Sequence, residues 1–229
     1  MKNENISCII CAFNEEKRIG VVLSALKDHP DIAEVIVVDD GSTDKTKEIV
    51  SQFPFAKLIS LEKNGGKSKA MAVGIKNAQY ELLMFLDADI LTITPQNITD
   101  LAKPVLSHKA DMSISLRSNS LLIYKLIGLD FVSGERVIYK NLLINEINNI
   151  EKLPGFGIEV FMNRIITKNK LKIKIVNWNN VIIEMKRGKI GFWRGTFADL
   201  LMTLEIFKVI SLKELITQNS QMLKLSVKD

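Results

Sequence analysis

Short apolar runs alternate with amphipathic stretches along the first 116 residues of the chain. The apolar runs predict strands at residues 6–13, 35–38, 56–60, 81–86 and 111–116. The stretches between them repeat apolar residues at helical spacing and predict helices at 15–27, 43–52, 66–78 and 96–107. Strands that alternate with helices are typical of βαβ units. We therefore expect an α/β fold, a Rossmann-like three-layer sandwich with a mostly parallel central sheet.

The loops that follow the predicted strands carry most of the candidate binding residues. Right-handed crossovers place the carboxyl ends of parallel strands at one edge of a sheet. Six polar side chains follow such ends: Asn14, Asp39, Asp40, Asn64, Asp87 and Asp89. We expect these segments to meet in one crevice. The sequence shows no internal repeat, low-complexity tract or flexible linker, which predicts a single domain over residues 1–229.

Two carboxylates, Asp87 and Asp89, end the apolar run that begins at Leu82. A continuous apolar run is typical of an interior strand of a parallel sheet. Two acids at the end of such a strand repel each other, and a divalent cation is the simplest partner for both. The alternative is an aspartate that caps the following turn. The position in the βαβ order favours the metal.

Two further loops have features that suit a nucleotide. In the loop 38–44, Ser42 or Thr43 is expected to cap the next helix, and Asp39 or Asp40 is expected to bind a base or ribose hydroxyls. The loop 63–70 places paired glycines and lysines at a helix start, which suits phosphate. Its spacing differs from that of a Walker P-loop, and no Gly-x-Gly-x-x-Gly follows the first strand.

Together these motifs resemble the family 2 nucleotide-sugar glycosyltransferases of GT-A fold. Residues 11–16 (Cys-Ala-Phe-Asn-Glu-Glu) look like the opening Pro-Ala-Tyr-Asn-Glu-Glu of that family, and residues 39–44 match its Asp-Asp-Gly-Ser-x-Asp. Residues 64–70 are similar to its Asn-x-Gly-Lys-Gly-x-Ala, and residues 87–89 to its Asp-x-Asp metal motif. The four motifs occur in order, across some 90 residues.

The resemblance implies a nucleotide-sugar site and a metal site. The members of the first are Ala12, Phe13, Asn14, Glu15, Asp39, Asp40, Asn64, Gly66, Lys67, Asp87, Ala88 and Arg117. Among them Ala12, Glu15 and Asp40 would hold the nucleoside. Asp89, helped by Asp87, would bind Mg²⁺ or Mn²⁺ that bridges the diphosphate of a UDP- or GDP-sugar.

The second half resembles the polyprenyl-phosphate (dolichol-phosphate type) sugar transferases. Residues 130–136 are similar to their Asp-x-Thr-Ser-Gly-Phe-Arg, Arg117 stands where they carry an arginine, and 186–189 resemble their terminal basic motif. Residues 155–159 are also similar to the Gly-Tyr-Gly-x-Glu of transferases that act on small phosphorylated acids. A surface ion pair is the alternative for each arginine.

Four positions depart from the family pattern. Cys11 replaces a proline and Ser68 a glycine, while Leu91 stands where some lipid-phosphate enzymes have a metal-binding glutamine. Glu135 replaces an aromatic residue of the polyprenyl-phosphate subgroup. This last departure puts the lipid-phosphate acceptor in doubt.

The implied function is metal-dependent transfer of a sugar from a nucleotide diphosphate sugar to an acceptor, such as a polyprenyl phosphate. Lys67 or Arg136 would help to stabilise the departing phosphate. Glu159 is the candidate base for a hydroxyl acceptor, or else a helix acid paired with a cation. Residues 1–116 would bind the nucleotide sugar and 117–229 the acceptor. The alternatives are a small phosphorylated acid, another soluble or glycan acceptor, or a catalytically inactive binding subunit.

Composition limits the partners and the compartment. The chain has 31 Lys and Arg against 26 Asp and Glu, a net charge of +5, but no nucleic-acid-binding motif. A phosphate-bearing substrate or an anionic membrane surface fits better. The apolar segments 121–129 and 200–215 would lie on such a surface or face the core. Cys8 and Cys11 should point to opposite faces of a strand as buried thiols. We expect a cytoplasmic protein, peripheral at the inner face of the membrane in the lipid-acceptor case, with His29 and His108 on the surface.

Overall fold

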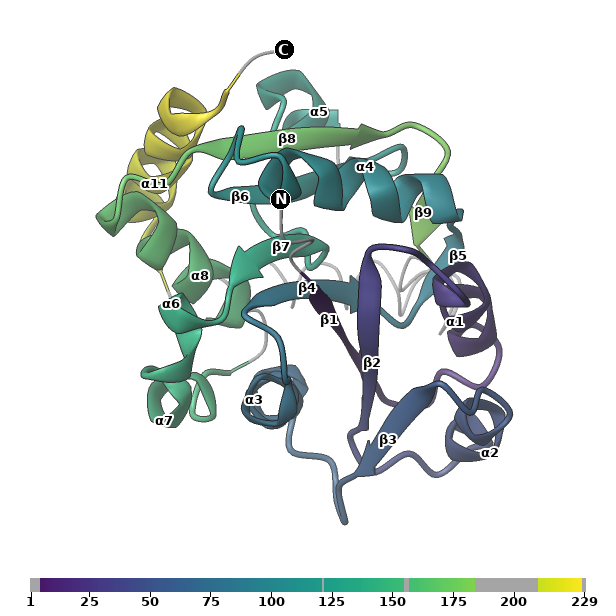
Figure 1. Ribbon diagram of the computed structural model, residues 1–229. Helices are drawn as coiled ribbons and strands as arrows, with labels where there is room; N and C mark the ends of the chain where they lie inside the picture. The colour runs from purple at the N-terminus through teal and green to yellow at the C-terminus, as the bar shows by residue number, and fades with distance from the viewer. Residues whose placement is uncertain (1–4, 121, 155–156, 184–209, 228–229) are drawn as a thin grey trace.

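A seven-stranded sheet forms the centre of the computed structural model, which describes residues 5–120, 122–154, 157–183 and 210–227 (Figure 1). The strands are β1 (Ile6–Ala12), β2 (Ile32–Asp39), β3 (Ala56–Ser60), β4 (Leu82–Asp87), β6 (Met112–Arg117), β7 (Arg136–Tyr139) and β8 (Ile173–Trp178). They lie in the order β3-β2-β1-β4-β7-β6-β8. Only β7 is antiparallel to its neighbours in this sheet. The mostly parallel α/β sheet expected from the sequence is thus confirmed.

Helices cover both faces of the sheet, as Figure 1 shows. On one side lie α1 (Ile19–Leu26), α2 (Thr46–Ser51) and α4 (Pro95–Leu106). On the other lie α3 (Lys67–Asn77), α6 (Asn141–Ile144), α7 (Ile147–Ile150) and α8 (Gly157–Lys168). Each layer encloses its own apolar cluster. Cys8 belongs to one cluster and Cys11 packs against the other, and both are free thiols, as the strand alternation predicts.

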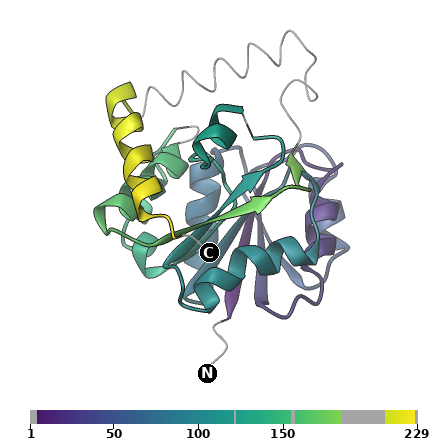
Figure 2. The same cartoon turned by 90° about the horizontal axis from the view of Figure 1, so that it is seen from above.

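The remaining elements lie around the sheet. They are α5 (Leu122–Ile127), α11 (Leu212–Leu225) and a two-stranded ribbon of β5 (Ile90–Thr92) and β9 (Ile182–Ile183). Seen from above, α11 lies beside α8 (Figure 2). The chain after α11 returns to the sheet, where the N–H of Val227 donates to the carbonyl of Ile173. Across the described ranges, no helix is long and apolar enough to cross a membrane.

The antiparallel strand β7 determines which residues meet at the functional edge of the sheet. It pairs with β4 and β6, and Arg136 lies opposite both Phe85 and Ile114. Because β7 runs against its neighbours, its entrance lies beside their carboxyl ends. Residues 133–135 therefore reach the edge where β4 ends in Asp87.

Two expectations about the first two helices are wrong. The first helix begins at Ile19 instead of residue 15, because the N–H groups of Glu15 and Glu16 donate to Thr46 and Asp44. Neither Ser42 nor Thr43 caps α2, which begins at Thr46.

His29 is buried, in contrast to the surface position expected for it, whereas His108 is exposed. Nε2 of His29 lies 3.1 Å from the carbonyl of Pro95 and Nδ1 accepts the N–H of Asp31, so the ring joins the β2 entrance to α4. The expectations for 186–189, and those for 155–156 and 200–209, lie outside the described residues.

Candidate active site

The loop after β2 and the loop before α3 are joined through Asp40. Its two carboxylate oxygens accept the N–H groups of Gly65 and Gly66, each at 2.8 Å. Gly41 has φ of 75°, and a Cβ there would lie 2.7 Å from the carbonyl carbon of Lys63. Only glycine fits this close approach with a left-handed backbone. Asp40 therefore holds the glycine pair at the start of α3.

The loop after β1 is attached to the same group of loops. The N–H of Asn14 donates to Ser42 Oγ and its side-chain oxygen accepts the N–H of Thr43, both at 2.9 Å. Glu15 is 8% exposed, and its carboxylate pairs with Arg18. These contacts bring three segments that are distant in sequence into one wall, as the βαβ pattern predicts.

Asp39 lies beneath this wall and is fully buried. Its Oδ2 accepts the N–H of Ser42 at 3.2 Å and lies 3.7 Å from Nζ of Lys47. Its Oδ1 has no hydrogen-bond partner among the described residues. Buried polar atoms are normally hydrogen-bonded. Asp39 therefore supports the loop through Oδ2, while its Oδ1 is enclosed by the fold.

Lys67, the first residue of α3, connects two acids from different parts of the fold. Its Nζ lies 2.7 Å from Asp87 Oδ1 at the end of β4 and 2.8 Å from Glu159 Oε1 on α8. Burial alone would lower the pKa of Lys67, but Asp87 and Glu159 raise it well above its ordinary value. Lys67 therefore stays charged. Glu159 itself has no solvent exposure.

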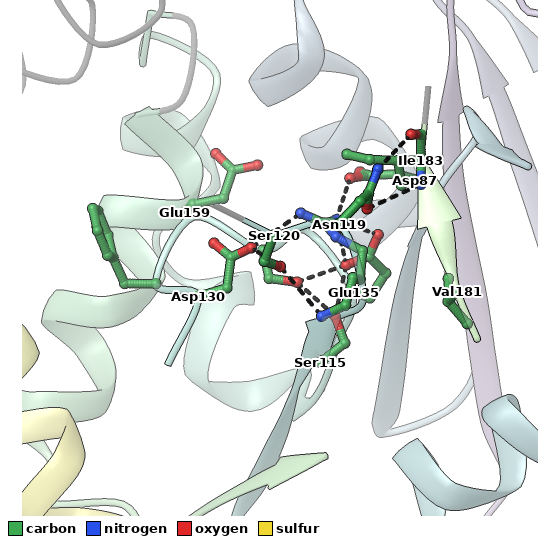
Figure 3. Close-up of polar contacts among 12 residues, drawn as sticks. Asp87, Ser115, Asn119, Ser120, Asp130, Glu135, Glu159, Val181 and Ile183 are labelled. Carbon is green, nitrogen blue, oxygen red and sulfur yellow. Dashed lines mark hydrogen bonds and ion pairs between the residues drawn. The ribbon is translucent and has the colours of Figure 1, made fainter. Parts of the chain in front are cut away.

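Arg117, the last residue of β6, is held by a cluster of acids and hydroxyl groups. Its Nη1 lies 2.7 Å from Glu135 Oε1, and its Nη2 lies 3.2 Å from Asp130 Oδ2. Figure 3 shows Ser115, Ser120, Asp130 and Glu135 gathered between Glu159 and Asp87. Burial alone would lower the pKa of Arg117, but Glu135, Asp130 and Asp87 raise it above its ordinary value.

The absence of a side chain at Gly134 lets the Asp87 carboxylate and the Lys67 ammonium group lie close to the main chain. A Cβ at this position would lie 2.5 Å from Asp87 Oδ1 and 2.8 Å from Lys67 Nζ. No side chain fits there without moving both groups. The backbone at Gly134 therefore forms one side of a cradle around the Asp87 carboxylate.

The position of Arg136 does not suit the catalytic role expected for it. The side chain is fully buried and donates to the carbonyls of Ser133 and Phe131, both at 2.8 Å, and to the side chain of Asn163 at 2.6 Å. Burial lowers its pKa to about 10. These contacts give Arg136 a structural role in the turn that carries Gly134.

The other expected site residues lie along the same edge. Ala12 and Ala88 are buried, Phe13 is 43% exposed and Asn64 is exposed. Asp89 is partly exposed in the turn between β4 and β5. Apart from Arg136, the residues expected at the site therefore lie on loops, strand ends and helix starts at one edge of the sheet.

The comparison with protein families decides the classification. The family model described as "Glycosyl transferase family 2" matches residues 7–172, which is more than half of the chain. The chain belongs to this family.

Curated relatives of this family 2 glycosyltransferase match it over part of their length. The poly-β-1,6-N-acetyl-D-glucosamine synthase of Staphylococcus epidermidis is 40% identical over 91 residues, which cover 38% of this chain and 22% of that protein. The dodecaprenyl-phosphate galacturonate synthase of Rhizobium johnstonii is 30% identical over 177 residues, or 72% of this chain and 50% of that protein. The chain thus spans half or less of these two relatives.

Solved structures confirm the GT-A fold expected from the resemblance. The glucosyl-3-phosphoglycerate synthase of Mycobacterium tuberculosis, crystallised with Mn²⁺, UDP and phosphoglyceric acid, has a TM-score of 0.66 and 23% identity. That match covers 79% of this chain and 71% of the synthase. A complex of the same enzyme with glucosyl-3-phosphoglycerate matches 97% of this chain and 78% of the enzyme, with a TM-score of 0.67 and 21% identity.

The residues of the glycosyltransferase fit a divalent metal ion at Asp87. Carboxylate oxygens are the ligands that Mg²⁺ and Mn²⁺ prefer, and Asp87 and Asp89 are both partly exposed at the end of β4. Within the described residues, no group of three or more His, Cys, Asp or Glu side chains could hold a metal. Asp87 and Asp89 would therefore supply one or two ligands, with water and phosphate oxygens completing the shell, as is usual for Mg²⁺.

Sequence reasoning did not assign three residues that line the site. Asp130, Gly134 and Glu135 lie in the segment that resembles the polyprenyl-phosphate enzymes, but only Arg136 was expected to act there. The sequence does contain a signal for Gly134, because this glycine stands in a Ser-Gly-Glu sequence that precedes a strand. An isolated glycine at a strand end often marks a close approach of the backbone to another group.

Proposed function

We propose that this family 2 glycosyltransferase transfers a sugar from a UDP- or GDP-sugar to an acceptor, with Mg²⁺ or Mn²⁺ held by Asp87 and Asp89. One observation carries the proposal. The glycine loop held by Asp40 leads directly into Lys67, whose ammonium group contacts Asp87. An ammonium group beside a carboxylate that can bind a cation suits a nucleotide diphosphate.

Each residue of this group has a defined part in the proposed reaction. When bound, the metal neutralises charge that develops on the departing diphosphate. Lys67 adds a fixed positive charge beside Asp87, and a preorganised charge needs no rearrangement as the reaction proceeds. Asp40 orients the glycine loop, and Asp39 supports the same loop from beneath by accepting the N–H of Ser42.

Glu159 is the proposed base for an acceptor hydroxyl. Its Oε1 contacts Lys67, while its Oε2 has no hydrogen-bond partner among the described residues. A carboxylate oxygen without a partner beside the reacting group can accept the hydroxyl proton. An acceptor phosphate is already anionic and would not need this step.

A screen of nucleotide sugars tests the nucleotide and metal parts of the proposal. Melting temperature and sugar hydrolysis are measured with UDP- and GDP-sugars, with and without Mn²⁺. We expect stabilisation that requires both nucleotide and metal, and its loss in Asp87→Asn and Asp89→Asn. Asp100→Asn, a substitution on α4 away from the site, serves as the control. Absence of any metal-dependent binding contradicts the proposal, and binding without turnover with any acceptor indicates a binding subunit.

For the acceptor we propose a polyprenyl phosphate, used at the inner face of the membrane. The similarity to the dodecaprenyl-phosphate galacturonate synthase supports this class. So does an apolar groove of about 480 Å³, lined by Ile127 of α5, Ile216 and Leu223 of α11 and the ammonium-bearing Lys224, among others. Leu126 beside it is 76% exposed. Apolar side chains with lysines nearby suit the surface of an anionic bilayer.

Flotation and an acceptor screen test this second part. With liposomes that contain anionic lipid we expect the protein to float, and Leu126→Ser with Ile216→Ser to abolish flotation. Val21→Ser, at an exposed valine on α1, is the control. Turnover is then compared with polyprenyl phosphate, 3-phosphoglycerate and a glycan. Turnover with only one of the last two overturns the lipid acceptor. In every case we propose that 1–116 bind the nucleotide sugar and 117–229 the acceptor.

A further inference from the structure

Asn163 lies in the middle of α8 and has no solvent exposure. Both ends of its carboxamide group are hydrogen-bonded. Oδ1 accepts a hydrogen bond from Nη1 of Arg136 at 2.6 Å, and Nδ2 donates to the carbonyl of Phe131 at 2.9 Å. One side chain of α8 is therefore bonded both to the side chain that begins β7 and to the main chain that leads into this strand.

The side chain of Arg136 extends this contact. Its Nε donates to the carbonyl of Ser133 and its Nη2 to the carbonyl of Phe131, both at 2.8 Å. These acceptors are neutral oxygen atoms, and a buried guanidinium group needs them, because a donor left without a partner in the interior is costly. Arg136 and Asn163 together thus fasten residues 131–133 to α8.

Glu159 depends on this attachment because of its place in α8. It lies four residues before Asn163, so the two side chains project from the same face of the helix. It is also the third residue of a helix that begins at Gly157, and the first turn of a helix has unpaired main-chain N–H groups. The position of Glu159 is therefore set by the contacts that hold α8 to the rest of the fold.

The contact that Glu159 makes tolerates little movement. Its Oε1 lies 2.8 Å from Nζ of Lys67, and the side chain is fully buried. A charge-assisted hydrogen bond spans about 2.7–2.9 Å, so a shift of about 1 Å in α8 ends it. A buried carboxylate that loses its cation is strongly unfavourable. Contact with Lys67 thus requires a precisely held helix.

We propose that Asn163 is a positioning residue, which acts through α8 to keep Glu159 in contact with Lys67. This inference rests on the proposed function, in which Glu159 and Lys67 both take part. Without the carboxamide group, α8 is free to shift against residues 131–133, and Glu159 moves away from Lys67. The role applies to a hydroxyl and to a phosphate acceptor, because Lys67 serves the departing diphosphate in both cases.

The test is hydrolysis of a nucleotide sugar by Asn163→Ala with Mn²⁺, in which water is the acceptor and the substrate is the UDP- or GDP-sugar that the wild-type protein hydrolyses. We expect kcat to fall about tenfold, because small displacements in an active site have effects of this size. KM should stay within about twofold, since a lost transition-state contact lowers kcat alone, and the loops at 39–44 and 64–66 are joined without α8.

Asn169→Ala is the matched control, because this exposed asparagine follows α8 and donates to the carbonyl of Ile165. Wild-type kcat in Asn163→Ala overturns the inference. If Asn163→Ala does not fold, Asn163→Ser leaves a hydroxyl group in the same space and carries the same prediction.

A double variant separates positioning from a merely structural role. Because Asn163 is proposed to act through Glu159, we expect Asn163→Ala with Glu159→Gln to have the kcat of Glu159→Gln alone. A merely structural role predicts the same fold loss from Asn163→Ala whether residue 159 is glutamate or glutamine. That result overturns the inference.

A crystal structure of Asn163→Ala gives a readout that needs no ligand. We expect the distance between Oε1 of Glu159 and Nζ of Lys67 to exceed about 4 Å, the limit of an ion pair. An unmoved Glu159 overturns the inference. This readout also separates the two proposals. If the wild-type protein neither binds nor hydrolyses any nucleotide sugar with Mn²⁺, the proposed function fails, while the position of Glu159 still decides the role of Asn163.

Discussion

The ammonium group of Lys67 lies 2.7 Å from Oδ1 of Asp87, and the same atom lies 2.8 Å from Glu159. The positive charge of Lys67 thus compensates the negative charges of an acid at the end of β4 and of an acid on α8. Asp87 belongs to the expected metal motif and Glu159 to the expected acceptor half. The two halves of the site are therefore coupled through one side chain before any ligand binds.

Lys67→Met should destabilise the protein by about 2–3 kcal/mol, because it leaves two neighbouring carboxylates without their cation. Mn²⁺ can replace the missing charge, so we expect it to raise the melting temperature more in this variant than in the wild type. Urea unfolding and thermal melting with and without Mn²⁺ measure both effects. Lys76→Met removes the surface pair with Glu151 and should cost less than about 1 kcal/mol. Equal losses in the two variants would show that the charges at Asp87 and Glu159 need no compensation.

Gly134→Ala should weaken Mn²⁺-dependent nucleotide binding about tenfold, about 1.4 kcal/mol. The added methyl group would contact Asp87 and Lys67 within 2.8 Å, and both must move. Isothermal titration with UDP or GDP measures the loss. Gly20→Ala is the matched control, because a Cβ there meets Ile49 at an ordinary 3.7 Å and alanine favours the α1 helix. Wild-type binding in Gly134→Ala would show that the cradle does not constrain the site.

Glu159→Gln distinguishes the classes of acceptor. If the acceptor is a hydroxyl, loss of the base should lower kcat about 10²- to 10⁴-fold. With a phosphate acceptor kcat should fall by much less, because the attacking oxygen is already charged. The measurement is nucleotide release with each acceptor at saturation. An unchanged kcat with a hydroxyl acceptor would remove Glu159 from the proposed chemistry.

Asp44→Asn should lower stability by about 1 kcal/mol at neutral pH. Burial alone would raise the pKa of Asp44, but hydrogen bonds from Thr46 and Glu16 lower it below its usual value. The stabilisation is therefore complete above the ordinary aspartate pKa of about 3.9 and is lost as pH falls through the lower pKa of the folded state. Urea unfolding between pH 3 and 7 follows this loss, with Asp100→Asn as the control. A difference that persists at the lowest pH would show that charge is not its cause.

Neither cysteine should react with iodoacetamide in the folded protein at pH 8. Burial raises the pKa of both thiols, that of Cys11 to about 12 although Lys67 opposes the rise. At pH 8 roughly one Cys11 thiol in ten thousand is then the reactive thiolate. Mass spectrometry should find both sites labelled only in urea. Rapid labelling of Cys11, which is partly buried, would contradict the raised pKa of its thiol.

The nucleotide side of the site could be predicted from the sequence, because its residues follow strongly patterned strands. Asp39, Asp40 and Asp87 each end or follow an apolar run that forms a parallel strand, and the crossover rule places such ends together. The contact from Asp40 to the glycine pair could not be predicted, because it depends on how close two loops approach. Both carboxylate oxygens of Asp40 accept hydrogen bonds from main-chain N–H groups as a result of this approach.

The part of the site around β7 was less predictable, because short elements form it. Strand β7 has four residues, too few to give a periodic signal, and it runs against the parallel pattern of the rest. Without that strand the sequence could not show that Gly134 lies beside Asp87 or that Arg136 points into the core. Glu135 appeared only as a departure from a family pattern, and its partners Ser115 and Arg117 come from another strand.

The reversed direction of β7 also affects how such a site can diversify. Residues 130–135 enter the strand, and their side chains take no part in the contacts that hold Asp40 to the glycine loop. Substitutions in this short segment can reshape one side of the crevice while the loops at 39–44 and 64–67 keep their geometry. A change between residues 130 and 135 therefore acts directly on the surroundings of Asp87 and Lys67, whereas the main-chain frame that joins Asp40 to the glycine loop does not depend on that segment.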